Sequence, residues 1–147
     1  MLEAEHDDDA VKSEALISSD DVPESGDKYS RSALSPELAQ ALIGEAQSLM
    51  DQEQLYLDSK LSLANLAERL KVSTNYLSQA INQCTEQNFF DFVNSYRIGY
   101  SMKLLGQQEK SVIDVAMDSG FNSKSAFYAA FKKHQNMTPG QYRQSIR

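Results

Sequence analysis

The sequence predicts an all-α fold of about seven helices, in which two similar helix pairs are joined by one long helix. Apolar residues recur every three or four positions along residues 34–147, which is the period of an amphipathic helix. No window shows the strict apolar and polar alternation of a half-buried strand. In addition, one short pattern of apolar and hydroxyl residues occurs twice, about 50 positions apart.

The first 33 residues differ from the rest in composition. They hold ten acidic and three basic residues, so the net charge of −7 that the whole chain carries lies in this segment. Large apolar side chains are few, which leaves too little apolar surface to offset the entropy of ordering. We therefore expect residues 1–33 to be a disordered acidic tail or linker, and residues 34–147 to form the folded domain.

The first expected helix begins at Ser35, Pro36 and Glu37. These residues supply an N-cap, a proline at the first helical position and an acidic residue in the first turn. Apolar residues at helical spacing continue the helix: Leu38, Leu42, Ile43, Ala46, Leu49 and Met50. This helix opens the folded domain.

Six further helices are expected after the irregular residues 54–60. Two short ones begin near Ser62 and Ser73, and a longer one runs over about residues 88–106, where Gly106 is a plausible stop. The last three cover 111–119, 123–134 and the residues after Thr138-Pro139.

The repeated pattern lies in the short helices. Leu63-x-x-Leu66-Ala67 matches Val112-x-x-Val115-Ala116, and Ser73-x-x-x-Leu77-x-x-x-Ile81 matches Ser123-x-x-x-Phe127-x-x-x-Phe131. The offset is 49 positions in the first helix of each pair and 50 in the second. The second turn therefore has one extra residue, at Gly120-Phe121-Asn122, where Gly120 can supply a positive φ.

Each copy predicts two short helices, a three- or four-residue turn and a serine that caps the second helix. This arrangement is typical of a helix-turn-helix. We place the copies at about residues 62–84 and 111–135, joined by the helix over about 88–106. A linker of about 19 residues spans roughly 28 Å, near the ~34 Å repeat of a DNA turn. One chain would then place a helix in each of two successive major grooves.

Charge is divided unevenly within the folded part. Residues 34–96 hold three basic and eight acidic residues, whereas residues 97–147 hold eight basic and three acidic ones. A polyanion would prefer the C-terminal half, because lysine and arginine neutralise phosphates. The acidic character of the whole chain therefore does not argue against binding to DNA.

Two stretches near the C-terminus stand out, GFNSKSAFYAAFKK at residues 120–133 and MTPGQYR at residues 137–143. Together they resemble the signature of the AraC/XylS family of bacterial transcription regulators. The repeat itself, with Asn75 and Asn94-x-x-Arg97-x-x-x-Ser101-x-x-Leu104-Leu105, matches the same pattern upstream. The resemblance covers about residues 34–147. It implies a homeodomain-like, AraC-type DNA-binding domain that binds double-stranded DNA sequence-specifically and regulates transcription.

The resemblance also implies that the second helix of each pair, here called the reading helix, contacts bases. The positions that match are Thr74, Asn75, Ser78, Gln79 and Asn82 in the first pair, and Lys124, Ser125, Tyr128 and Ala129 in the second. Helical geometry supports the first set independently, because Leu77 and Ile81 must face the core. The amide side chains suit adenine edges.

A second group is expected to contact the DNA backbone, because capping hydroxyls and helix N-termini suit a phosphate. Its members are Ser73, Arg97, Ser123, Lys132, Lys133 and Thr138. Arg97 has an alternative role, an ion pair with Asp91 or Asp114.

Three positions depart from the family pattern. Ala129 stands where arginine is frequent, and Gln79 stands where a basic residue is common, so we expect modest affinity or a preference for A·T-rich sites. Asn136 replaces a glycine of the family turn. Asparagine tolerates the left-handed conformation better than most residues, so the turn is expected to be kept.

Other function classes find little support. Cys84 is the only cysteine and neither histidine has suitable neighbours, so we expect no metal, no cofactor, no small-molecule site and no enzyme activity. No apolar run approaches the ~18 residues of a membrane span. The alternative to a DNA-binding domain is a helical protein-interaction module, which the acidic surroundings of the first helix pair favour.

Further partners and location follow from the resemblance. RNA polymerase is a candidate partner, and residues 28–34 resemble the joint that follows a membrane sensor in some larger relatives. We therefore expect a cytoplasmic, DNA-associated chain, or the cytoplasmic part of a membrane-anchored parent that carries a sensor domain upstream.

Overall fold

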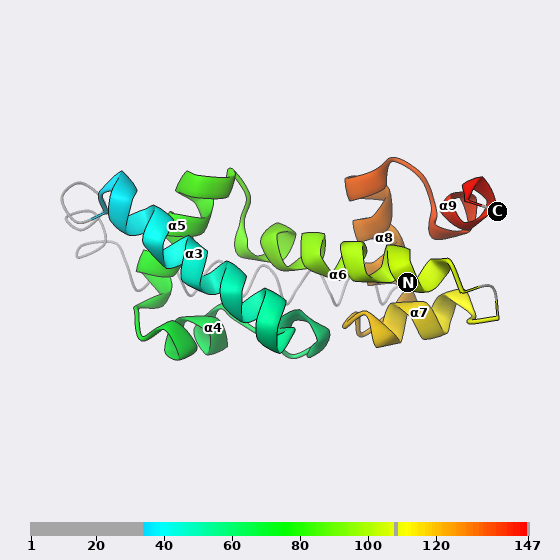
Figure 1. The fold of residues 1–147 in the computed structure, drawn as a ribbon, viewed down its shortest axis with the longest axis horizontal. Coiled ribbons are helices and arrows are strands. Elements are labelled where there is room, and N and C mark those ends of the chain that lie inside the picture. Colours follow the sequence, from blue (N-terminus) through cyan, green and yellow to red (C-terminus); the bar gives the residue numbers. More distant parts are fainter. Residues whose placement is uncertain (1–33, 108, 147) are drawn as a thin grey trace. The chain divides into compact units, whose positions relative to one another are not determined.

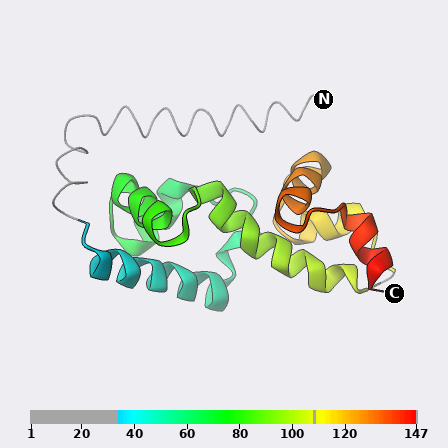
Figure 2. The same ribbon diagram turned by 90° about the horizontal axis from the view of Figure 1, so that it is seen from above.

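The computed structural model describes residues 34–107 and 109–146, and the elements below lie within them (Figures 1 and 2). They are α3 (Pro36–Glu53), η1 (Leu55–Leu57), α4 (Leu63–Leu70), α5 (Thr74–Thr85), α6 (Phe89–Leu105), α7 (Val112–Asp118), α8 (Lys124–Gln135) and α9 (Pro139–Ser145). No strand occurs among the described residues, so the predicted all-α fold of about seven helices is confirmed. The predicted tail, residues 1–33, lies outside them.

The described residues form two compact units. The first unit comprises residues 34–54 and 61–92, and the second comprises residues 55–60 and 93–146. Residues 55–60 connect α3 to α4, yet they pack with the second unit. Each unit contains one of the two predicted helix pairs, α4 with α5 and α7 with α8.

Three helices build the core of the first unit, where α3 packs against both α4 and α5. Ser35 starts α3, because its Oγ accepts a hydrogen bond from the Leu38 backbone N–H at 3.2 Å. The buried side chains are Ala39, Leu42, Ile43, Ala46 and Met50 from α3, Leu66 and Ala67 from α4, and Leu77, Ala80 and Ile81 from α5. Leu38 itself is 53% exposed, so the buried stripe of α3 begins at Ala39.

An aromatic cluster holds the second unit together. The Phe127 ring lies 5.2 Å from Phe121 and 5.7 Å from Phe131, measured between ring centroids, and Phe131 lies 5.7 Å from Tyr142 of α9. Val115 and Ala116 of α7 are buried in the same cluster. These contacts fix α8 between α7 and α9 and leave its opposite side accessible.

Candidate nucleic-acid interface

Both helix pairs make their turn through a residue with positive φ and an equivalent backbone hydrogen bond. Lys71, the first residue after α4, has a φ of 62°. Gly120 holds the corresponding position after α7 and has a φ of 96°. The Val72 N–H donates to the Ala67 carbonyl at 3.0 Å, and the Phe121 N–H donates to the Ala116 carbonyl at 3.1 Å. The sequence repeat is therefore a structural repeat, and the predicted positive φ at Gly120 is confirmed.

The extra residue of the second turn lies next to the cap of α8. Positions correspond at an offset of 49 up to Phe121, and at an offset of 50 from the capping serines onward, so Asn122 is the insertion. Ser73 Oγ accepts from the Tyr76 N–H at 3.0 Å, and Ser123 Oγ accepts from the Ala126 N–H at 3.0 Å. Both reading helices thus start from an equivalent N-cap.

The first reading helix, α5, presents an uncharged polar face. Leu77 and Ile81 are fully buried, as helical geometry predicts. The five base-reading candidates of this helix are accessible: Asn82 is exposed, and Thr74, Asn75, Ser78 and Gln79 are half-buried. Because α5 holds no acidic or basic residue, its face can recognise only through hydrogen bonds and shape.

The second reading helix, α8, presents a basic face. Lys124, Ser125 and Ala129 are exposed, and Tyr128 is half-buried. The Lys124 Nζ lies 5.4 Å from the centroid of the Tyr128 ring. Lys132 and Lys133 are exposed in the last turn, where the helix dipole favours cations.

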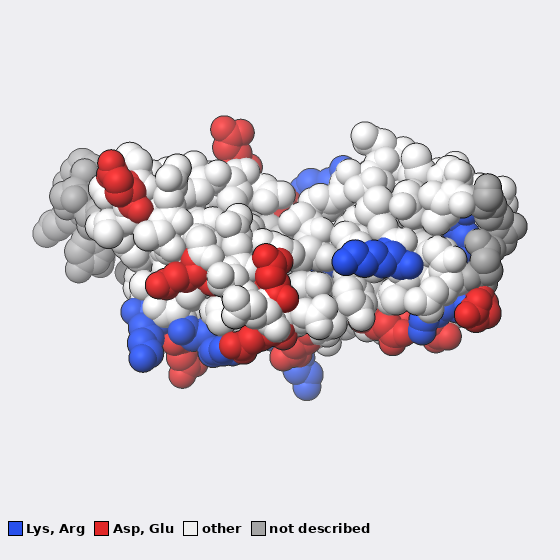
Figure 3. All heavy atoms as spheres, viewed as in Figure 1, with Lys and Arg blue, Asp and Glu red and all other residues white. Residues whose placement is uncertain are grey.

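Outside α5, the charged residues of the first unit are mainly acidic. Helix α3 carries four acidic residues, Glu37, Glu45, Asp51 and Glu53, and no basic one. Figure 3 shows acidic side chains over α3 on the face that it displays. Glu53 forms an ion pair with Arg69 of α4, with 2.7 Å between the Arg69 guanidinium nitrogen and the carboxylate. The first unit therefore contributes little positive potential around its reading helix.

Arg97 is part of the fold of the second unit. Its Nε donates to the Tyr56 carbonyl at 2.6 Å, and its terminal nitrogens donate to the Asp58 carbonyl at 3.0 Å and to Asn94 Oδ1 at 3.4 Å. The guanidinium also lies 5.7 Å from the centroid of the Phe121 ring. Burial lowers the pKa of Arg97 to about 10, and the nearby Asp58 carboxylate raises it, so the side chain stays charged at neutral pH.

These contacts bear on both roles that the sequence suggested for Arg97. The carboxylate that acts on its pKa belongs to Asp58, whereas the sequence pointed to Asp91 or Asp114. All three guanidinium nitrogens already donate to protein oxygens. A phosphate would have to compete with them.

The segment held by Arg97 covers the turn of the second helix pair. A Cβ added at Gly120 would lie 2.3 Å from the Tyr56 carbonyl oxygen and 3.0 Å from Leu57 Cα, so only glycine fits. Tyr56 is buried and stacks on Tyr96, with 5.6 Å between the ring centroids. Sequence reasoning missed this contact, because three residues of 3-10 helix carry no periodic signal.

A second arginine fixes the other end of the unit. Arg143 of α9 donates from Nε to the Leu105 carbonyl at 3.0 Å, and from a terminal nitrogen to the carbonyls of Gln107 at 3.1 Å and Lys110 at 2.7 Å. These carbonyls lie at and after the C-terminal end of α6. Arg143 thus holds the connection that leads into α7.

The repeat extends past the reading helices. Both end in a left-handed residue, Glu86 with φ 58° and Asn136 with φ 62°. The Asn136 N–H donates to the Lys132 carbonyl at 2.8 Å, so the turn expected at this position is kept. The next helices then begin at similar caps, because Asn88 Oδ1 accepts from the Asp91 N–H at 2.8 Å and Thr138 Oγ1 accepts from the Gln141 N–H at 3.1 Å.

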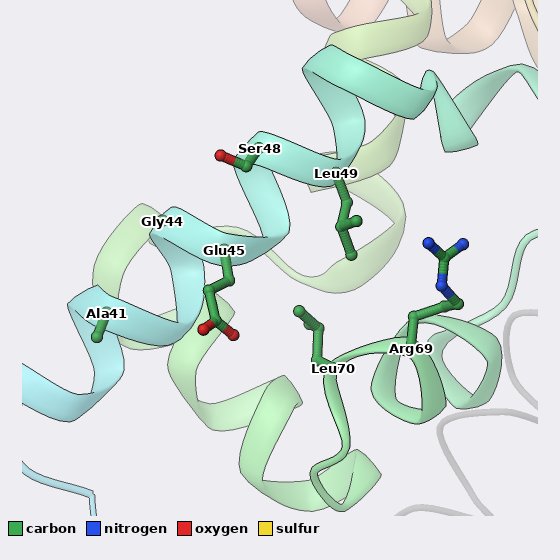
Figure 4. A pocket seen from close by; sticks show the side chains of 7 residues that line it. All are labelled: Ala41, Gly44, Glu45, Ser48, Leu49, Arg69 and Leu70. Carbon is green, nitrogen blue, oxygen red and sulfur yellow. The ribbon is translucent and has the colours of Figure 1, made fainter.

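Other kinds of site find no support among residues 34–107 and 109–146. Figure 4 shows a shallow, open depression between α3 and the end of α4, lined by Ala41, Gly44, Glu45, Ser48, Leu49, Arg69 and Leu70. No group of three His, Cys, Asp or Glu side chains in this range could hold a metal ion. None of its helices is both long and apolar enough to cross a membrane.

Comparison with known proteins agrees with this geometry. A family model described as a helix-turn-helix domain matches residues 66–145, more than half of the chain. The chain is also 33% identical over 86 residues to the melibiose operon regulatory protein of Escherichia coli K12. That match covers 58% of this chain and 28% of the relative.

The chain belongs to the AraC-type helix-turn-helix family. Among solved structures, it is similar to the C-terminal domain of AraT, a response regulator from Geobacillus stearothermophilus, with 30% identity and a TM-score of 0.64. That likeness covers 78% of this chain and 88% of the other. A transcriptional regulator of Chromobacterium violaceum with an AraC-type DNA-binding domain is 26% identical, with a TM-score of 0.62 over 71% and 91% of the two chains. This AraC-type family consists of DNA-binding domains rather than enzymes.

Proposed function

We propose that this chain binds double-stranded DNA sequence-specifically and regulates bacterial transcription, with α5 and α8 in successive major grooves. The observation that carries the proposal is the repeated geometry: each pair has a left-handed turn, a serine-capped reading helix, one fully buried face and one accessible polar face. The 17 residues of α6 join the pairs. At about 1.5 Å per residue this helix is roughly 25 Å long.

The proposed base contacts are those expected from the sequence. They are Thr74, Asn75, Ser78, Gln79 and Asn82 of α5, and Lys124, Ser125, Tyr128 and Ala129 of α8. For the backbone we propose Ser73, Ser123, Lys132, Lys133 and Thr138. Arg97 is left out, because its guanidinium donates to the carbonyls of Tyr56 and Asp58.

We place the DNA-binding domain at residues 34–147 and residues 1–33 before it as an acidic tail or linker. The proposed location is the cytoplasm, and the proposed parent is a longer regulator with a sensor domain upstream. The chain spans only 28% of the melibiose regulator. The sensor domain that would receive the controlling signal is therefore part of this proposal. We propose no catalytic activity and no cofactor.

The test is enrichment of bound duplexes from a random DNA library, followed by a salt titration on the selected duplex. We expect a bipartite motif with half-sites about 10–11 base pairs apart, and affinity that falls as salt rises. The Gln79→Ala variant should weaken selection in one half only. The proposal fails if no motif is enriched and salt-sensitive binding is also absent.

A second candidate function is a contact with another protein, and α7 favours it. Ile113 and Met117 are 46% and 45% exposed, one turn apart, and the acidic residues Asp114 and Asp118 adjoin them. RNA polymerase is the proposed partner. An Ile113→Ser/Met117→Ser variant should keep its affinity for DNA and lose transcription activation. Equal activation by this variant and the parent would argue against the contact.

A further inference from the structure

The second reading helix begins with a cation in an unfavourable position. Lys124 is the first residue of α8, directly after the N-cap Ser123. The N-terminus of a helix carries a partial positive charge, so a lysine there is destabilised, whereas lysines in the last turn are stabilised. Lys124 is exposed and forms no ion pair with any residue in the described part of the chain. Helix stability therefore does not explain this lysine.

Among the described residues, Tyr128 makes the contact that orders the Lys124 head group. It lies one helical turn later, and its ring centroid is 5.4 Å from Lys124 Nζ, within range of a cation–π interaction. The ring is itself fixed, because it packs edge-on against the buried Phe127 with an interplanar angle of 90° and a centroid distance of 6.1 Å. A lysine side chain loses less freedom on binding if it is already restricted.

Lys124 is also the only charged side chain on the part of either reading helix that would face bases. Helix α5 has none, and after Lys124 the next charged residue of α8 is Lys132, more than two turns away. The N-terminal residues of a reading helix are the ones that reach base edges. Among the four bases, guanine offers a cation two acceptors in the major groove, O6 and N7.

We propose that Lys124 reads a guanine in the second half-site and that Tyr128 acts as its positioning residue. This inference rests on the proposed function. It gives the second half-site one guanine contact. The lysine lies over the Tyr128 ring face, so we propose an indirect role for Tyr128 in place of the direct base contact given above.

The test measures binding to duplexes in which each base pair of the selected second half-site is changed in turn. The parent chain should prefer guanine at one position by about fivefold or more. Lys124→Gln should shift the preference at that position toward adenine, because glutamine pairs with adenine N6 and N7. The control Lys132→Gln should weaken binding to every duplex by a similar factor.

The role of Tyr128 is tested by two further variants. Tyr128→Phe keeps the ring face and should keep the guanine preference, whereas Tyr128→Leu should reduce it about two- to fivefold with an unchanged salt slope. A general loss of folding would lower affinity for all duplexes alike, so position-specific preference separates the two effects.

Each failure has its own meaning. A parent chain that enriches no motif overturns the proposed function itself. A parent chain that selects a motif, but whose guanine preference is absent or survives Lys124→Gln, overturns the lysine assignment alone. A Tyr128→Leu variant with full guanine preference overturns the positioning role.

Discussion

The two helix-turn-helix pairs share a backbone and differ in what surrounds it. Lys71 and Gly120 hold the same left-handed position of the turn, with φ 62° and φ 96°. Lys71 is exposed, whereas Gly120 is buried under the Tyr56 carbonyl. The comparison shows that a left-handed turn accepts a lysine where the position is exposed and φ is 62°. At Gly120 both the φ of 96° and the Tyr56 carbonyl packed over the turn exclude a side chain.

The reading helices differ in a similar way. Helix α5 has no charged residue, and α8 carries Lys124, Lys132 and Lys133. Base edges are recognised by hydrogen bonds, whereas phosphates are recognised mainly by charge. We infer that α5 contributes selectivity and that α8 contributes most of the electrostatic affinity, together with the guanine contact proposed for Lys124.

The largest effect should come from Gly120→Ala. The new Cβ would lie 2.3 Å from the Tyr56 carbonyl oxygen at a positive φ, so we expect a loss of about 3 kcal/mol or more in the free energy of unfolding. Lys71→Ala at the equivalent position should change it by less than about 0.5 kcal/mol. Urea unfolding of both variants measures the difference, and equal stabilities would break the comparison.

Arg97→Met should have the next largest effect. It removes the charged donor from the Tyr56 and Asp58 carbonyls, which should cost about 2–3 kcal/mol in unfolding free energy. The matched change in the first unit, Arg69→Met, breaks an exposed ion pair with Glu53 and should cost less than about 1 kcal/mol. The salt slope of DNA binding should be unaffected. A slope reduced by about 0.9 in Arg97→Met would instead mark Arg97 as a phosphate contact.

Gln79→Ala sharpens the assignment of selectivity to α5. The amide is accessible on the reading face, and its loss should remove about 1–3 kcal/mol of discrimination at one base pair of the first half-site. Gln47→Ala, an exposed change on α3, should leave discrimination intact. Competition binding with single-base variants of the selected duplex measures both. If discrimination weakens across both half-sites alike, Gln79 does not read a base.

The smallest effects should come from the left-handed residues that end the reading helices. Glu86 has φ 58°, and a glycine there should stabilise the chain by about 1 kcal/mol, because the left-handed conformation is costly for most side chains. Asn136→Gly should raise the free energy of unfolding by only about a few tenths of a kcal/mol, because asparagine adopts this conformation readily. Thermal unfolding compares the two, and a larger gain at Asn136 would contradict the explanation.

Much of the fold follows from local sequence signals. Capping serines at positions 35, 62, 73 and 123 and apolar spacing locate the helix starts, and Leu77 and Ile81 locate the buried face of α5. These features depend on neighbours within one or two helical turns. The repeat at offsets of 49 and 50 then pairs the helices.

These local signals do not predict the long-range contacts. Arg97 donates to a carbonyl 41 positions away, and Arg143 donates to one 38 positions away. Backbone carbonyls are present at every residue, so the sequence does not show which of them an arginine meets. For the same reason the sequence predicts a phosphate contact for Arg97 without showing the carbonyls that it meets, and the place of residues 55–60 in the second unit was not predicted.

The roles inferred for α5 in selectivity and for α8 in electrostatic affinity can be tested by the salt dependence of DNA binding on the selected duplex. The parent chain, Gln79→Ala and Lys132→Gln would be titrated over the same range of salt. We predict that Lys132→Gln reduces the magnitude of the log–log slope by about 0.9 and leaves base discrimination unchanged. Gln79→Ala should leave the slope unchanged and flatten selection in one half-site. Binding that does not depend on salt, or a slope that changes with Gln79 and not with Lys132, would contradict the account.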